Sequence, residues 1–155
     1  LANLQYNTND YAAALASFTE ALTLYRELAA AKNPDVYLPD VATTLNNLGA
    51  LQSETNDYAA ALTSFTEALT IHRELATKNP DFYLPDVAMT LNNLGTLQSD
   101  TNDYVAALAS YTEALTIRRE LAVRNPDVYL PDVAGSLINM AWWYYKAPQA
   151  NQQQS

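Results

Sequence analysis

Asparagines recur at a constant spacing and are the residues of this sequence best suited to bind a polypeptide backbone. Two pairs and a single residue form the series: Asn46, Asn47, Asn92, Asn93 and Asn139. Each side-chain amide offers two donors and an acceptor, which suits the backbone of an extended peptide. We expect at least one column of these amides to face a groove. The alternative is that one of each pair only bonds a neighbouring helix or loop.

Small, polar and acidic residues accompany the asparagines at positions that would face the same groove. They are Ala50, Ser53 and Glu54 in one copy and Thr96, Ser99 and Asp100 in the next. No lysine or arginine occupies these columns before Lys146, so the groove lacks the cations that bind carboxylates. The sequence therefore predicts a partner that is neutral or basic rather than acidic. A groove that this chain does not use is the alternative.

Four consecutive aromatic residues form the least expected segment: Trp142, Trp143, Tyr144 and Tyr145. Trp142 and Tyr145 fall in the groove columns, whereas Trp143 shares a column with leucines and should pack inward. Exposed aromatic clusters often mark interaction sites. Three interpretations stay open: a capping helix, a surface covered by sequence outside this chain, or a contact with another copy. The third contact would be head to tail and would give rings or filaments.

No residue pattern favours catalysis, a cofactor or a metal ion. His72 is the only histidine, and because its column also holds Tyr25 and Arg118 we expect it to face solvent. The sequence contains no glycine-rich phosphate loop, and its Asn-Pro-Asp loops lack the ligand pattern of a calcium loop. We therefore predict that the chain is not an enzyme, and we assign it no catalytic, cofactor-binding or metal-binding residue.

The composition narrows the class of partner further. The chain has 155 residues, with 17 acidic and 8 basic side chains and a net charge of −9, which argues against nucleic acid as the main partner. It contains no apolar run of about 18 residues, so no membrane span is predicted. The absence of cysteine excludes a disulfide framework and is compatible with a reducing cytoplasm.

The spacing of the asparagines reflects an internal repeat of 46 residues. The motifs Thr-Asn-Asp-Tyr, Asn-Pro-Asp and Tyr-Leu-Pro-Asp each occur three times, with one extra alanine near residue 30. Residues 40–85 and 86–131 differ at only ten positions. A period of this length is typical of a solenoid. The near-identity of the copies favours recent duplication or consensus engineering, and both stay open.

Each repeat is predicted to contain two helices. In residues 40–85 the first runs from about Asp40 to Glu54, with apolar residues at three- and four-residue spacing and Asp40 as its N-cap. The second runs from about Tyr58 to Thr77. The Thr-Asn-Asp-Tyr motif between them is predicted to form a turn and a cap.

These boundaries define the predicted organisation of the chain. Residues 1–147 form one solenoid domain, and residues 148–155 form a disordered polar tail. The solenoid divides into a partial repeat at 1–39, complete repeats at 40–85 and 86–131, and a partial repeat or capping helix at 132–147.

A set of small and apolar residues recurs at fixed positions in both complete repeats. The set is Leu45, Leu48, Gly49, Ala61 and Phe65 in one, and Leu91, Leu94, Gly95, Ala107 and Tyr111 in the other. This pattern resembles the signature of the tetratricopeptide repeat family, W-x₂-L-G-x₂-Y followed by A-x₃-F. The small residues let two helices approach closely, and the aromatic ring fills the space beside them.

The resemblance implies an all-α, right-handed superhelical solenoid of antiparallel helix pairs, with a peptide-binding groove lined by the first helices. Two departures stand out: Gln52 and Gln98 replace the usual tyrosine, and Arg73 stands where a proline would end the second helix. The repeat is therefore longer than the usual 34 residues. Long repeats with a Leu-Asn-Asn-Leu core resemble those of kinesin light chains and of many bacterial multi-repeat proteins.

Together these features predict a protein–protein interaction scaffold that binds an extended or helical peptide segment in its groove. The alternative function is a self-assembling structural scaffold, joined head to tail through the aromatic residues at 142–145.

Overall fold

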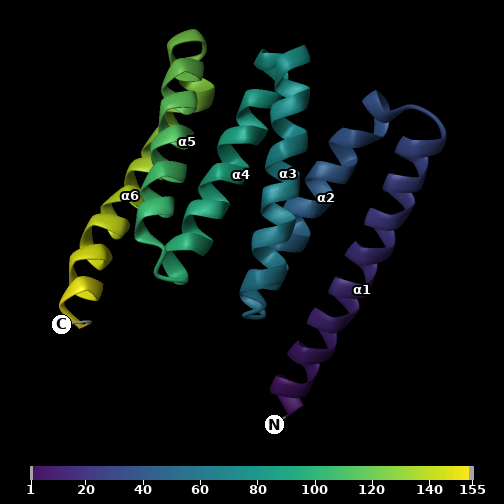
Figure 1. Ribbon diagram of the computed structural model, residues 1–155, viewed down its shortest axis with the longest axis horizontal. Helices are drawn as coiled ribbons and strands as arrows, with labels where there is room; N and C mark the ends of the chain where they lie inside the picture. Colours follow the sequence, from purple (N-terminus) through teal and green to yellow (C-terminus); the bar gives the residue numbers. More distant parts are fainter. Residues whose placement is uncertain (1, 154–155) are drawn as a thin grey trace. The chain divides into compact units, whose positions relative to one another are not determined.

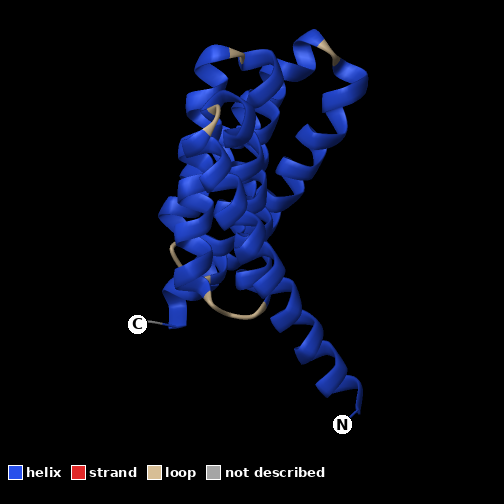
Figure 2. Cartoon of the chain, turned by 90° about the vertical axis from the view of Figure 1, so that its right-hand side faces the viewer, coloured by secondary structure: helices blue, strands red, loops and turns tan. Residues whose placement is uncertain are grey.

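The computed structural model describes residues 2–153 and the side chains of residues 10–147. Within this part the chain forms six α-helices and no strand, joined by short loops (Figures 1 and 2). They are α1 (Ala2–Ala31), α2 (Pro34–Glu54), α3 (Tyr58–Lys78), α4 (Pro80–Asp100), α5 (Tyr104–Arg124) and α6 (Pro126–Gln153). The all-α prediction is therefore confirmed.

The chain divides into two compact units, Leu1–Ile71 and His72–Ser155, and the boundary falls within α3. In the first unit α1 packs against α2. In the second unit α4 packs against α5 and α5 against α6, with a smaller contact between α4 and α6. The predicted right-handed superhelix concerns the stacking of these units and stays a prediction.

The first helix of each repeat begins earlier than predicted. Helix α2 starts at Pro34, and the side chain of Asn33 accepts a hydrogen bond of 3.0 Å from the backbone N–H of Asp35. Proline at the first helical position loses nothing, because that N–H has no intrahelical partner. Pro39 is accommodated inside α2, so the prediction that Asp40 caps this helix is wrong. The predicted second helix is confirmed and ends at Lys78.

The Thr-Asn-Asp-Tyr motif forms the predicted turn between α2 and α3 and again between α4 and α5. Asn56 adopts a left-handed backbone (φ 62°), and the hydroxyl of Tyr58 donates to its side-chain oxygen at 2.8 Å. A carboxylate oxygen of Asp57 accepts from the backbone N–H of Ala60 and caps α3. The first copy, residues 8–11, lies inside α1 instead.

Helix α6 is longer than predicted. The sequence predicted that it ends before the polar tail, but it continues to Gln153. Glutamine and alanine have high helix propensity, and they make up most of this segment. Residues 154 and 155 of the predicted disordered tail lie outside the described part of the chain.

Close approach at a glycine joins the two helices of each complete repeat. A Cβ atom added to Gly49 would lie 2.9 Å from the ring of Phe65, and one added to Gly95 would lie 2.8 Å from the ring of Tyr111. Both rings are buried. The predicted role of these small residues is therefore confirmed.

Two polar contacts explain the departures from the usual signature. The glutamine that replaces tyrosine accepts a hydrogen bond from a serine of the following helix, Ser64 to Gln52 and Ser110 to Gln98, both at 2.7 Å. Arg26 and Arg73, which stand in place of a helix-ending proline, each bind both oxygens of one glutamate. Each of these two second helices thus carries an arginine that binds a glutamate of the next second helix.

His72 is buried, contrary to the prediction that it faces solvent. Its side chain is 1% exposed, and its Nδ1 lies 3.0 Å from the Oγ1 of Thr90 on α4. Arg118, the equivalent residue of α5, donates to the Oγ of Ser136 on α6 at 2.7 Å. The column tolerates both histidine and arginine because each one reaches a buried hydroxyl on the next first helix.

The glycine contact predicts opposite effects for two matched substitutions. We expect Gly95→Ala to lower the free energy of unfolding by about 1–2 kcal/mol, because overpacking costs more than the gain in helix propensity returns. A Cβ at Gly135 would meet no atom within 4 Å, so Gly135→Ala should raise it by up to about 1 kcal/mol. Urea denaturation measures the free energy of unfolding of both variants. Equal changes in the two variants would contradict the packing argument.

Burial of His72 predicts a loss of stability in mild acid. Burial lowers the pKa of His72 below its ordinary value, and the neighbouring charge of Asp86 only partly opposes this. The unfolded chain therefore binds a proton more readily, and stability falls as the pH drops below about 6.5. We expect the Tm to decrease from pH 7.5 to 5.5, and to decrease less in His72→Gln, which keeps a polar partner for Thr90. An equal decrease in both proteins would show that His72 does not control it.

Candidate functional site

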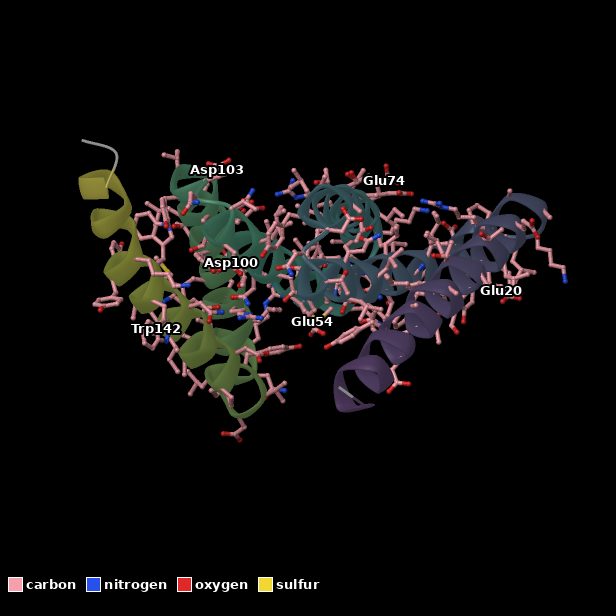
Figure 3. The ribbon with its side chains drawn as sticks, turned by 90° about the horizontal axis from the view of Figure 1, so that it is seen from below. Glu20, Glu54, Glu74, Asp100, Asp103 and Trp142 are labelled. Atoms are coloured by element: carbon pink, nitrogen blue, oxygen red, sulfur yellow. The ribbon has the colours of Figure 1, made fainter. Side chains whose placement is uncertain are left out.

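Helices α4 and α6 of the second unit border a cleft, with α5 behind it. The cleft has a volume of about 180 Å³. Its lining residues are Thr96, Ser99, Asp100, Tyr111, Asn139, Trp142, Trp143 and Lys146. Five of the residues predicted to line a groove are among them: Thr96, Ser99, Asp100, Asn139 and Trp142. Figure 3 shows Asp100 and Trp142 on their two helices, seen from below.

Hydroxyl groups from α4 and α5 form one wall of the cleft. The hydroxyl of Tyr111 donates to the Oγ1 of Thr96 at 3.1 Å, and Ser99 lies buried one turn further along α4. Burial raises the pKa of Tyr111, so its phenol stays protonated and keeps its donor at neutral pH. The position of Tyr111 follows from its contact with Gly95, which holds its ring against α4.

A hydrogen bond between asparagines of the two columns links α4 to α6. The Nδ2 of Asn139 donates to the Oδ1 of Asn92 at 2.9 Å. Asn139 also lines the cleft, so one residue both joins the two helices and borders the candidate site. This bond agrees with the interpretation that one asparagine of each pair joins neighbouring helices, whereas a ladder of groove-facing amides stays a prediction.

Opposite charges meet at the rim of the cleft. The Nζ of Lys146 lies 3.7 Å from the Oδ1 of Asp100, and both side chains are about half exposed. An exposed pair of this kind contributes little to stability. It leaves a carboxylate and an ammonium group close together at the entrance, where either can bind a charged group of a ligand.

The four aromatic residues of α6 divide between two surroundings. Trp143 is half-buried, as predicted, and its Nε1 donates to the backbone oxygen of Tyr104 at 2.9 Å. Trp142 and Tyr145 are 59% and 61% exposed and pack edge to face, with ring centroids 5.9 Å apart. Trp142 lines the cleft, whereas Tyr145 extends its aromatic surface from outside the lining.

The other predicted groove residues lie elsewhere. In the first unit Asn46 is buried, Ala50 and Ser53 are half-buried, and Asn47 and Glu54 are exposed, all on α2. Asn93 is half-buried on α4 and does not line the cleft of the second unit.

The predicted groove residues did not include Tyr111, Trp143 and Lys146, although Lys146 was recognised as the first cation in the groove columns. Lys146 also follows Asn139 and Trp142 at helical spacing and lines the cleft with them. Tyr111 and Trp143 were expected to be core residues, and they are core residues whose edges reach the cleft.

The cleft offers hydrogen-bonding groups, opposite charges and aromatic surface. In the part of the chain that the structure describes, no group of three histidine, aspartate or glutamate side chains is placed to hold a metal ion. The helices of that part include none that is both long and apolar enough to cross a membrane.

Comparison with known protein families gives two matches. A family model described as tetratricopeptide repeat matches residues 1–74, and a second with the same description matches residues 87–127. The matched ranges include both glycine–aromatic contacts. A comparison with curated proteins found no match. The likeness to kinesin light chains stays a prediction.

Proposed function

We propose that this chain, which belongs to the tetratricopeptide repeat family, binds a peptide segment of another protein in the cleft between α4 and α6. Repeats of this family are generally non-catalytic scaffolds for protein–protein interaction. The peptide is extended or helical, and the chain acts as a binding module, not as an enzyme. The observation that carries the proposal is the meeting of amide, hydroxyl and aromatic groups in one cleft.

Polar groups of the cleft suit a peptide backbone. Thr96, Ser99 and Asn139 present two hydroxyls and an amide, which together can donate to carbonyl groups and accept from N–H groups. They come from two first helices, so a peptide lying across α4 and α6 would meet all of them. The bond between Asn139 and Asn92 holds this amide in place before any ligand arrives.

Trp142 is the proposed anchor for a side chain of the peptide. Tryptophan and tyrosine dominate the binding energy of many protein interfaces, because they bury a large area with few rotatable bonds. Trp142 is exposed, and its ring orientation is supported by the edge-to-face contact with Tyr145. An apolar or aromatic side chain of the partner would cover both rings.

The charge of the chain favours a neutral or basic partner. Its net charge of −9 attracts basic segments over long range. Asp100 can bind a lysine or arginine at the cleft, after Lys146 moves aside. A cytoplasmic partner is part of the proposal, since a cysteine-free chain suits a reducing compartment.

Substitution of Trp142 tests this function. A random-peptide library is selected on the chain, and the affinity of the enriched peptides is then measured for Trp142→Ala and Phe82→Ala. Phe82 is an equally exposed aromatic residue at the start of α4, away from the cleft. We expect Trp142→Ala to weaken binding by about 30-fold, a typical loss at an aromatic anchor, and Phe82→Ala to leave it unchanged.

Two results would contradict parts of the proposal. Equal binding by Trp142→Ala and the unchanged chain would show that the peptide does not use the cleft. A shared acidic motif among the enriched peptides would contradict the charge preference and leave the cleft in place. Circular dichroism of each variant confirms that its helices are intact.

A further inference from the structure

Helix α6 exposes a face that is buried in the other first helices. On α4, which packs against α5, Ala88 and Leu91 are 0% and 2% exposed. The equivalent residues of α6, 46 positions later, are Ala134 and Leu137. Ala134 is exposed, and Leu137 is 44% exposed. Within the described residues no helix follows α6 to cover this face.

Helix α1 shows the complementary feature. By its sequence it is a second helix, and its Ala14 and Phe18 correspond to Ala61 and Phe65 of α3. Those two residues of α3 are buried in the contact with a first helix. Ala14 and Phe18 are only half-buried, and within the described residues no helix precedes α1. Helix α6 thus exposes the face with which a first helix packs against a second helix, and α1 exposes the matching face of a second helix.

We propose that α1 of one copy docks on α6 of a second copy, so that the chain associates head to tail. This inference goes beyond peptide binding and does not depend on it. The docked pair resembles the arrangement of α4 and α5, with Phe18 lying beside Ala141 where Tyr111 lies against Gly95. Because Ala141 carries a Cβ atom, the ring of Phe18 would lie further from α6 than the ring of Tyr111 lies from α4.

Charge complementarity favours a second copy over any other occupant. Arg26 binds Glu67 at 2.6 Å, and Arg73 binds Glu113 at 2.8 Å, so the arginine of each second helix reaches the glutamate of the next. Arg119 on α5 is the equivalent of these two arginines, and Glu20 on α1 is the equivalent of the two glutamates. Both side chains are exposed. A docked copy brings its Glu20 to Arg119 and continues the series in the same register.

The docking face differs from the face predicted from the sequence. Trp142 lines the cleft, and Trp143 packs on α5 of its own chain. Of the four aromatic residues only Tyr144, the equivalent of Gln98, lies in a column that faces the following helix. Association therefore leaves the lining of the cleft unused. A head-to-tail contact is heterologous and gives rings or filaments, not a closed dimer.

Sedimentation at increasing protein concentration tests the association. We expect the average mass to rise with concentration and Leu137→Glu to weaken association by about tenfold or more, because docking would bury an unpaired carboxylate. Leu62 of α3 is 46% exposed and lies outside both docking faces, so Leu62→Glu is the matched control. Both leucines are exposed, so neither variant should unfold the chain. A chain that stays monomeric throughout, or equal loss in both variants, would overturn the proposal.

Cross-linking tests the orientation of the copies. The chain has no cysteine, so Glu20→Cys and Arg119→Cys each introduce a single thiol. A short bismaleimide should join a Glu20→Cys chain to an Arg119→Cys chain and should leave each variant alone uncross-linked. Efficient cross-linking of Arg119→Cys to itself would indicate a symmetric contact and would refute head-to-tail docking.

Discussion

The contact between a glycine and an aromatic ring sets the geometry on which each repeat depends. Gly95 lets the ring of Tyr111 lie against the backbone of α4, at a distance that no larger residue permits. This contact places the hydroxyl of Tyr111 beside Thr96, and thereby forms one wall of the cleft. The same approach brings Ser110 within reach of Gln98. Packing and the candidate site therefore have one origin.

Polar contacts between successive repeats complete this arrangement. Asn139 binds Asn92, and Arg118 binds Ser136, so the last helix is held to both helices before it. Each of these bonds lies in or near a buried region, where an unpaired polar group would be costly. They favour one register between neighbouring helices, because a shift of one residue would break both at once. Side chains that border the cleft are thus held in place by the stacking of repeats.

The sequence predicts the fold more completely than the site, for physical reasons that differ from residue to residue. Apolar periodicity and the repeated turn motif indicated the helix pairs, because both act locally. The starts of α2 and α4 were misplaced, since Pro39 and Pro85 were interpreted as helix boundaries although each lies inside a helix. His72 was misplaced because residue variety in its column was taken for exposure, whereas a buried hydroxyl accepts several partners. The cleft residues Tyr111 and Trp143 depend on tertiary packing, which no local pattern reports.

Each repeat carries its own starting cap, its own turn and its own arginine for the next repeat. The turn at Asn56 recurs with the same hydrogen bond at Asn102, in segments that are otherwise nearly identical. A stretch of this length can therefore be gained or lost by a single recombination event, without the need for any new packing arrangement. Evolution, or an engineer, can change the length of such a chain in whole units, because the turn and its hydrogen bond are copied with the segment that makes them.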